Sequence, residues 1–150
     1  MPRHQVFDLD FSSNDYLGFS QHPKIIDAAV LAAKTYGVGS KASRMITSQQ
    51  KQFKELEGLI AKSKDTQNSL LFATGYQANV SVLMAVLDPK LFGGQPPLVF
   101  SDRLNHASMH AACQALKIKQ IRYNHLDADH LTWVLEKHRS SNQPKFILTE

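Results

Sequence analysis

Apolar residues recur every three to four positions in two segments near the start of the chain. The first, HPKIIDAAVLAAKTYG (residues 22–37), has Pro23 close to its beginning and Gly37 at its end, where helices often carry these residues. The second, QQKQFKELEGLIAKSK (residues 49–64), has a similar spacing and a charged face that is expected to be solvated. The pattern predicts two helices, each with one apolar face.

After residue 68 the period of the pattern changes. Short apolar and β-rich runs alternate with helical patterns at residues 76–87, 106–117 and 127–138. Such alternation predicts a parallel sheet with helices packed against it, and therefore an α/β fold. The segment DPKLFGGQPP (residues 88–97) is expected to be a surface loop, since its Gly and Pro pairs interrupt regular structure. The runs interpreted as strands are SLLFA (69–73), PLVFS (97–101), KQIRY (119–123) and KFILTE (145–150).

Composition and charge narrow the class of protein. A chain of 150 residues that is 43% hydrophobic is long and apolar enough to form one globular domain or part of one. The net charge of +4 comes from scattered basic residues, which argues against nucleic acid and suits a small anionic ligand such as a phosphorylated cofactor or a CoA ester. The single cysteine, Cys113, allows no disulfide framework. We expect a cytoplasmic protein without a membrane partner, because the sequence has no signal-peptide pattern and no apolar run of about 20 residues.

The stretch LLFATGYQANVSVLMAV (residues 70–86) passes from an apolar run into a helical pattern at Thr74, Gly75 and Tyr76. The N-terminus of a helix presents main-chain N–H groups without partners, and its dipole favours an anion such as phosphate. A tight turn in which Thr74 merely caps the helix explains the same residues. The local sequence leaves both interpretations open.

In an open parallel sheet, residues that follow the strands meet at the carboxyl edge. The predicted strands lead to Thr74, Gly75 and Tyr76, to His106 in SDRLNHAS, and to Glu150. We therefore expect main-chain amides, an imidazole and a carboxylate to converge at one edge. A histidine that only caps a helix or packs in the core is the alternative for His106.

Two other patterns point to different chemistry and are weaker. GVGSKA (residues 37–42) matches a dinucleotide-binding fingerprint, but it follows a helix where that motif requires a strand. His106 and His110 have the spacing of zinc ligands without the glutamate of the usual motif, and His125 or His130 would have to supply a third ligand. We expect neither a nicotinamide cofactor nor a metal.

Four motifs occur in a fixed order along the chain: SSNDYLGFSQHP, YGVGSKASRMITS, FATGYQAN and SDRLNHAS. In this order they resemble the α-oxoamine synthases, pyridoxal phosphate (PLP) enzymes that condense an amino acid with an acyl-CoA and release carbon dioxide. The resemblance covers residues 11–150. It implies the PLP-dependent aspartate-aminotransferase-like fold (fold type I), with an N-terminal segment at residues 1–48 and the first part of the large parallel-sheet domain at residues 49–150.

The resemblance also implies roles for individual residues. Gly75 and Tyr76 would donate main-chain N–H groups to the phosphate of PLP, and His106 would stack on its pyridine ring. Asn14 of NDYLG matches the position that binds the carboxylate of the amino acid, with formation of a local turn as its alternative role. The family assembles homodimers. The branch that serves biotin synthesis fits best, with L-alanine and a pimeloyl thioester as substrates, and the glycine-using branches are the alternative.

The sequence departs from the family pattern at several positions. Lys41 and Ala42 replace two glycines of a G-S-G-G-S-R motif, Phe53 and Ser48 replace a common histidine and glycine, and the segment at 88–97 is longer than usual. These changes bear on the choice of acyl chain more than on the cofactor.

The chain also ends before the family's aspartate partner of the ring nitrogen and before the lysine that binds the cofactor covalently. We therefore expect an N-terminal portion that is inactive on its own. Lys41 is the lysine whose position in the sequence does not exclude it from that role. A binding or interaction module without catalysis is the alternative function.

Overall fold

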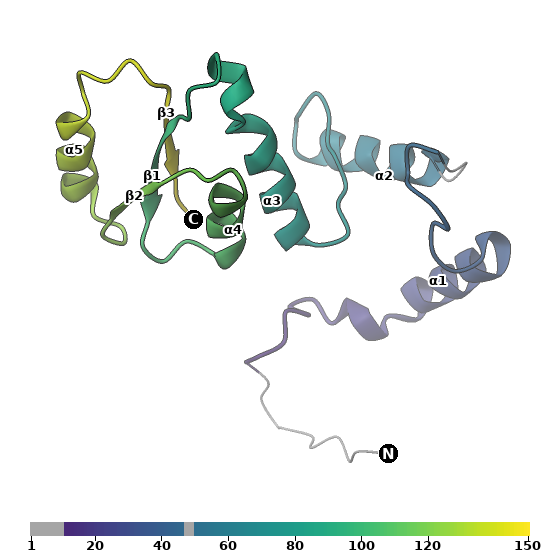
Figure 1. Ribbon diagram of the computed structural model, residues 1–150. Helices are drawn as coiled ribbons and strands as arrows, with labels where there is room; N and C mark the ends of the chain where they lie inside the picture. Colours follow the sequence, from purple (N-terminus) through teal and green to yellow (C-terminus); the bar gives the residue numbers. More distant parts are fainter. Residues whose placement is uncertain (1–10, 47–49) are drawn as a thin grey trace. The chain divides into compact units, whose positions relative to one another are not determined.

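The computed structural model describes residues 11–46 and 50–150 and divides into two compact units that adjoin in the sequence between Lys54 and Glu55 (Figure 1). Ser48 and the predicted division between residues 48 and 49 lie outside the described residues, and the domain limits remain a prediction.

The first unit contains the helix expected near the start of the chain. A single turn of 3-10 helix, η1 (Phe19–Gln21), precedes α1 (Pro23–Tyr36), and α2 (Gln50–Ser63) begins in this unit and ends in the second. Proline occupies the first turn of α1, and Gly37 follows it with a φ of 82°, a conformation that glycine adopts without strain. Both helices predicted from the periodicity are confirmed.

The second unit is a parallel α/β structure. Its three strands run parallel in the order β2-β1-β3, with Phe100 opposite Ile121 on one side and Ile147 on the other. The predicted fold class is therefore confirmed. Its elements are α3 (Gly75–Val86), η2 (Pro89–Phe92), β1 (Leu98–Asp102), α4 (Ala107–Ala115), β2 (Gln120–Tyr123), α5 (Ala128–Lys137) and β3 (Lys145–Leu148).

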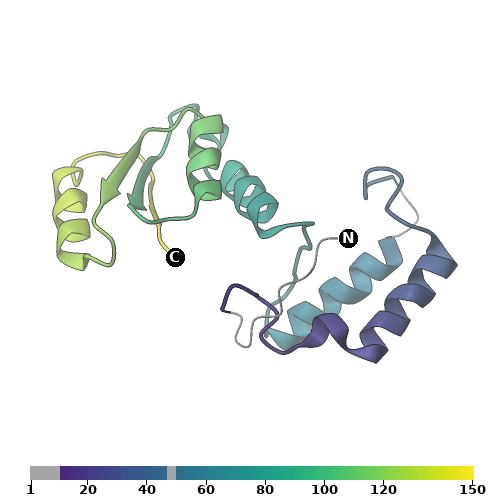
Figure 2. The ribbon, with the colours of Figure 1, turned by 90° about the horizontal axis from the view of Figure 1, so that it is seen from below.

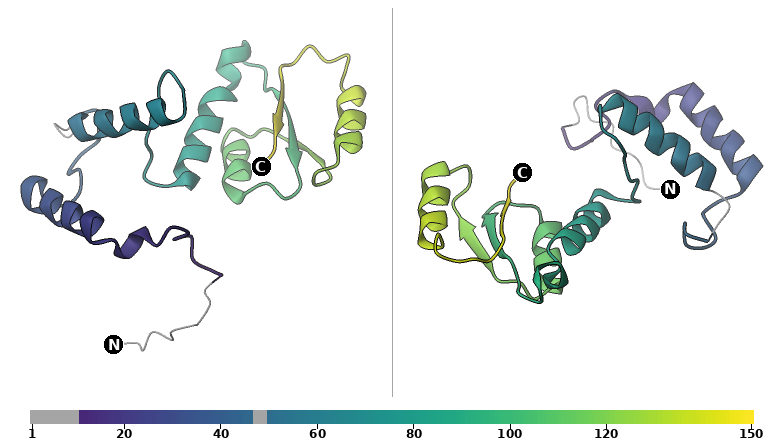
Figure 3. Two further views of the ribbon diagram at one scale, coloured as in Figure 1. Left: turned by 180° about the vertical axis from the view of Figure 1, so that it is seen from behind. Right: turned by 90° about the horizontal axis from the view of Figure 1, so that it is seen from above.

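Helices cover both faces of this sheet. Figure 1 shows α3 and α4 on one face and α5 on the other, and the two views of Figure 3 show the same three layers. Successive residues of β1 serve the two faces, because side chains of a strand alternate: Val99 packs with Leu87 and Cys113 on the α3–α4 face, and Phe100 packs with Val134 on the α5 face. The burial on both faces explains why β1 begins with a continuous apolar run.

One predicted strand is wrong. The run at 69–73 has no strand structure, although it leads directly into α3 as expected (Figure 2). Its polar groups bind α2 instead: the Ser69 hydroxyl donates to the main-chain oxygen of Glu57 (2.7 Å), and the Leu71 N–H donates to the Glu57 carboxylate (2.7 Å). An apolar run becomes a strand only where a neighbouring strand accepts its hydrogen bonds, and among residues 11–46 and 50–150 this run has none.

The segment at 88–97 is more ordered than the sequence suggests. It begins with η2, whose first N–H groups are capped by Asp88, and Phe92 then packs against Phe146 of β3 with the ring centroids 5.9 Å apart. Its two glycines follow with positive φ, as a turn requires.

Within the described residues, no helix is long and apolar enough to cross a membrane.

Candidate functional site

The N-terminus of α3 presents two main-chain N–H groups. Thr74 caps the helix, since its hydroxyl accepts from the N–H of Gln77 (3.0 Å) and its main-chain oxygen accepts from Ala78. The N–H groups of Gly75 and Tyr76 have no acceptor in the described part of the chain. A Cβ built on Gly75 would meet no atom within 4 Å, so the space beside these amides is open. Capping by Thr74 therefore leaves these two N–H groups available to an anion.

His106 is the N-cap of α4, one of the alternatives left open by the sequence. Its ring nitrogen Nδ1 accepts from the N–H of Ser108 (3.2 Å) and lies 2.7 Å from the Ser108 hydroxyl. The same ring meets the ring of Tyr76 edge to face, with the centroids 6.2 Å apart and an angle of 73°. The cap therefore also places the imidazole beside the N-terminus of α3.

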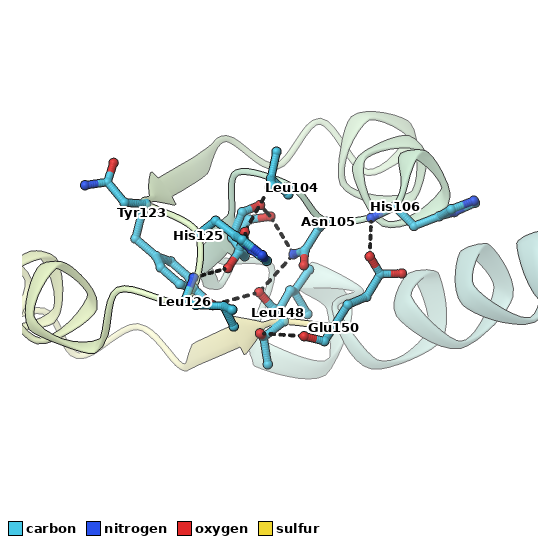
Figure 4. Close-up of polar contacts among 12 residues, drawn as sticks. Leu104, Asn105, His106, Tyr123, His125, Leu126, Leu148 and Glu150 are labelled. Atoms are coloured by element: carbon cyan, nitrogen blue, oxygen red, sulfur yellow. Dashed lines mark hydrogen bonds and ion pairs between the residues drawn. The ribbon is translucent and has the colours of Figure 1, made fainter.

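Glu150 completes the convergence expected from the sheet topology. Its carboxylate accepts a hydrogen bond of 2.9 Å from the main-chain N–H of His106, and Figure 4 shows the two groups facing each other. Tyr76, His106 and Glu150 follow three different segments of the chain and meet at one edge. His106 and Glu150 meet because they follow β1 and β3, parallel strands whose carboxyl ends lie together. Tyr76 joins them through the packing of α3 against α4, since the run before it is not a strand.

A polar link between α3 and α4 is not apparent from the sequence. The side-chain amide of Asn79, one turn into α3, donates to the hydroxyl of Ser108 (3.0 Å), and Ser108 is fully buried. No local pattern signals this pair, because a partly buried asparagine finds its partner only when the two helices pack.

Asp102, at the end of β1, likewise makes contacts that the sequence does not reveal. Its side chain is buried and accepts from the N–H groups of Leu104 (2.8 Å) and Leu126 (3.1 Å), and His125 Nδ1 lies 3.0 Å away (Figure 4). Burial raises the pKa of this carboxyl group, but the two N–H donors and His125 outweigh it, so that the pKa lies below its ordinary value. Asp102 thus fixes the loop between β2 and α5 with an ionised carboxylate.

The histidines considered as metal ligands have other contacts. His110 Nδ1 lies 2.7 Å from the side-chain oxygen of Gln120, and His130 Nδ1 accepts from the N–H of Asn124 (3.0 Å). Among residues 11–46 and 50–150, no three His, Cys, Asp or Glu side chains are grouped so that they could hold a metal ion.

Asn14, Lys41 and Phe53 belong to the first compact unit. Asn14 is exposed, and its assigned role remains a prediction. Lys41 has a φ of 62°, a value that glycine adopts more easily than lysine, at a position where the family usually has glycine. The guanidinium of Arg44 lies 4.9 Å from the centre of the Phe53 ring, so the residue that replaces a common histidine makes a cation–π contact.

Comparison with known proteins identifies the family. Residues 8–150 match the model of the aminotransferase class I and II family. The chain is 46% identical over 143 residues to 8-amino-7-oxononanoate synthase of Gluconacetobacter diazotrophicus, a match that covers 95% of this chain and 36% of that protein. The chain thus spans about a third of the length of this curated relative.

Two solved enzyme structures are also similar to most of this chain. A serine palmitoyltransferase from S. paucimobilis with bound PLP–myriocin aldimine is similar to 88% of this chain and 31% of its own, with a TM-score of 0.76 and 26% identity. The 8-amino-7-oxononanoate synthase of Francisella tularensis is similar to 93% of this chain and 36% of its own, with a TM-score of 0.65 and 25% identity.

Proposed function

The chain belongs to the aminotransferase class I and II family, and from this membership we propose that it is the N-terminal portion of a PLP-dependent acyltransferase. The activity that we propose for the complete enzyme is the decarboxylating condensation of an amino acid with an acyl thioester. The convergence of the α3 N-terminus with the His106 ring carries the proposal, because it joins an anion site to a flat aromatic group.

The residues at this edge suit the cofactor. The N–H groups of Gly75 and Tyr76 are free to donate to a phosphate, the positive end of the α3 dipole adds to the attraction, and the space above Gly75 is open. His106 is exposed beside them, and its ring nitrogen Nδ1 is held by the Ser108 hydroxyl. A phosphate and an aromatic ring on one ligand match this arrangement.

When bound, PLP supplies an electron sink for the carbon from which the carboxylate leaves. The residues of this chain bind and orient it. Gly75 and Tyr76 would hold the phosphate end, while the His106 ring would cover one face of the pyridine and keep it in a single orientation. Glu150, bound to the main chain of His106, fixes the start of α4 and thus the position of the ring.

L-alanine and a pimeloyl thioester are the substrates we favour, which would place the enzyme in biotin synthesis. The identity to 8-amino-7-oxononanoate synthase over nearly the whole chain supports this choice. Turnover of alanine and of glycine, each with pimeloyl and short acyl thioesters, tests it in the complete enzyme. A preference for glycine would instead indicate a relative such as 2-amino-3-ketobutyrate ligase or 5-aminolevulinate synthase.

Two variants of His106 test the proposed contact with the cofactor. His106→Ala removes the ring and the helix cap together, whereas His106→Asn removes the ring and keeps a side chain suited to the N-cap. We expect both to weaken retention of PLP and to slow condensation in the complete enzyme. If PLP absorbance and turnover survive both changes, His106 does not have this role.

The complete enzyme is further expected to be a cytoplasmic homodimer, as members of the family are. Sedimentation of the active protein tests this expectation. An enzyme that is active as a strict monomer would contradict it.

A further inference from the structure

The proton on the His106 ring can be located from the hydrogen bonds of Ser108. A main-chain N–H is always a donor, and the N–H of Ser108 points at Nδ1 of His106 at 3.2 Å. Nδ1 must therefore carry a lone pair and no proton. A neutral imidazole has one proton, and so that proton is on Nε2.

The Ser108 hydroxyl reinforces this arrangement. It lies 2.7 Å from Nδ1, and because Nδ1 is an acceptor, the hydroxyl donates its single proton there. The same oxygen then accepts from the side-chain N–H of Asn79 at 3.0 Å. The donors run in one direction, from Asn79 through Ser108 to His106, and Ser108 is fully buried, so that water does not compete for its hydroxyl.

The other ring nitrogen, Nε2, makes no hydrogen bond with the residues that the structure describes, and His106 is exposed. The imidazole therefore offers one N–H donor at its outer edge and a neutral face.

We propose that Ser108 and Asn79 are positioning residues that hold His106 as the neutral Nε2–H tautomer. The consequence for the cofactor rests on the function proposed above. A neutral ring can stack on a protonated pyridine without charge repulsion, whereas an imidazolium would repel it. The Asn79–Ser108 pair thus connects α3, whose N-terminus would hold the phosphate, with the ring that would cover the other end of the same ligand.

The tautomer itself is measured by ¹⁵N NMR of the complete enzyme labelled at the histidine rings, with and without PLP. The signal of His106 is assigned from its loss in His106→Asn. Protonated and unprotonated ring nitrogens differ clearly in ¹⁵N shift, and we expect an unprotonated Nδ1 and a protonated Nε2 in both forms. A protonated Nδ1 would overturn the proposal. The result does not depend on catalysis, and failure of the enzyme to bind PLP would refute the proposed function separately.

Asn79→Asp gives the sharpest test of the direction of the hydrogen bonds between Asn79, Ser108 and His106. Aspartate has the shape of asparagine and can still bind the Ser108 hydroxyl, but only as an acceptor. The hydroxyl would then donate to Asp and could no longer donate to Nδ1, which would keep only the main-chain N–H of Ser108 as its donor. We expect a dissociation constant for PLP about tenfold higher, an effect at least as large as that of Asn79→Ala. If Asn79 only joins two helices, Asp should be tolerated better than Ala, and that order would overturn the proposal.

A double-mutant cycle tests whether Ser108 acts through His106. Loss of the hydroxyl in Ser108→Ala should raise the dissociation constant of PLP about three- to tenfold. In the His106→Asn background the same change should have no further effect, because the ring it positions is gone. An equal effect in both backgrounds would overturn the proposal. Ser141→Ala, which removes a partly buried hydroxyl in the loop before β3, is the control and should leave PLP binding unchanged.

Discussion

The side-chain amide of Asn105 donates a hydrogen bond of 2.9 Å to the main-chain oxygen of Leu148, a residue 43 positions later in the chain (Figure 4). The same amide donates to the hydroxyl of Ser101 at 3.0 Å, and Asn105 is only 6% exposed. One buried side chain thus ties the loop after β1 to the end of β3. His106 follows Asn105 directly, so this tie also sets where α4 begins.

Asn105→Ala should therefore lower the free energy of unfolding by about 1–3 kcal/mol, the cost of leaving buried polar partners without a donor. The Tyr123 hydroxyl, 3.3 Å from the oxygen of Leu148, limits the loss. Urea unfolding of the complete enzyme without cofactor measures it. Asn124→Ala, at a partly buried asparagine in the loop before α5, is the matched control with a smaller expected change. Equal effects of the two substitutions would contradict a special role for Asn105.

Gly75→Ala separates binding of phosphate from stability. A Cβ on Gly75 meets no protein atom within 4 Å, so the substitution should leave the stability of the cofactor-free enzyme unchanged or slightly higher. The same Cβ would occupy the space where the phosphate approaches the amides, and we expect the dissociation constant of PLP to rise about tenfold or more through loss of a charge-assisted hydrogen bond.

Gly58→Ala is the control for this experiment. Gly58 lies inside α2, where a Cβ also has open space, so Ala should raise stability by about 1 kcal/mol and leave PLP binding unaffected. Thermal unfolding and titration with PLP measure both quantities. If Gly75→Ala binds PLP as tightly as Gly58→Ala, the phosphate does not lie at the α3 N-terminus.

Asp102 should make stability depend on pH in the acid range. Its pKa in the folded protein lies below the ordinary value of 3.8. Burial raises this pKa, but the N–H groups of Leu104 and Leu126, together with His125, lower it by more. The carboxylate of Asp102 thus binds a proton more readily in the unfolded chain than in the folded protein. The stabilisation is present above about pH 4 and is lost as the pH falls through the folded pKa.

Asp102→Asn tests this dependence. The variant should be less stable than the parent near pH 7, since asparagine cannot replace both oxygens as acceptors, and the difference should shrink below pH 4. Urea unfolding at a series of pH values gives the comparison, with Asp27→Asn at an exposed position of α1 as control. A difference that stays constant down to pH 2.5 would show that the ionised form of Asp102 is not favoured by folding.

Much of the fold follows from the period of the apolar residues. The change from helical to strand spacing marks the sheet, and parallel strands bring their carboxyl ends together, which is why His106 and Glu150 meet as predicted. Tyr76 contacts His106 as well, although it follows no strand. The strand predicted at 69–73 fails because an apolar run cannot reveal which partner its main chain will find. Here that partner is Glu57.

Side-chain links between distant segments are the part of the site that the sequence conceals. Asn79 and Ser108 lie 29 positions apart, and each alone is an ordinary polar residue of a helix. Asp102 is similar, because its three partners come from loops whose course depends on the finished sheet. Such pairs arise from packing, whereas caps such as Thr74 arise from local sequence and are predictable.

Residues 1–150 alone should not catalyse the proposed condensation, because their lysines are badly placed to hold PLP covalently. Lys145 begins β3, at the end of the strand opposite the site, and its ammonium donates to the main-chain oxygen of Ser141 (2.7 Å). Lys119 directly precedes β2 and therefore also lies at the end of its strand opposite the site. The ammonium of Lys137, in the last turn of α5, lies 3.3 Å from the centre of the Trp133 ring.

Lys41 is the candidate that its position in the sequence does not exclude, and reduction with borohydride tests its role. The purified chain is incubated with PLP and reduced, the modified lysines are mapped, and product formation is assayed in parallel. We expect sparse labelling of several surface lysines and no product. Lys41→Arg keeps the charge and cannot form the covalent link, so it serves as the control. Stoichiometric labelling of Lys41, lost in Lys41→Arg and accompanied by measurable product, would defeat the prediction and make this chain a catalyst in its own right.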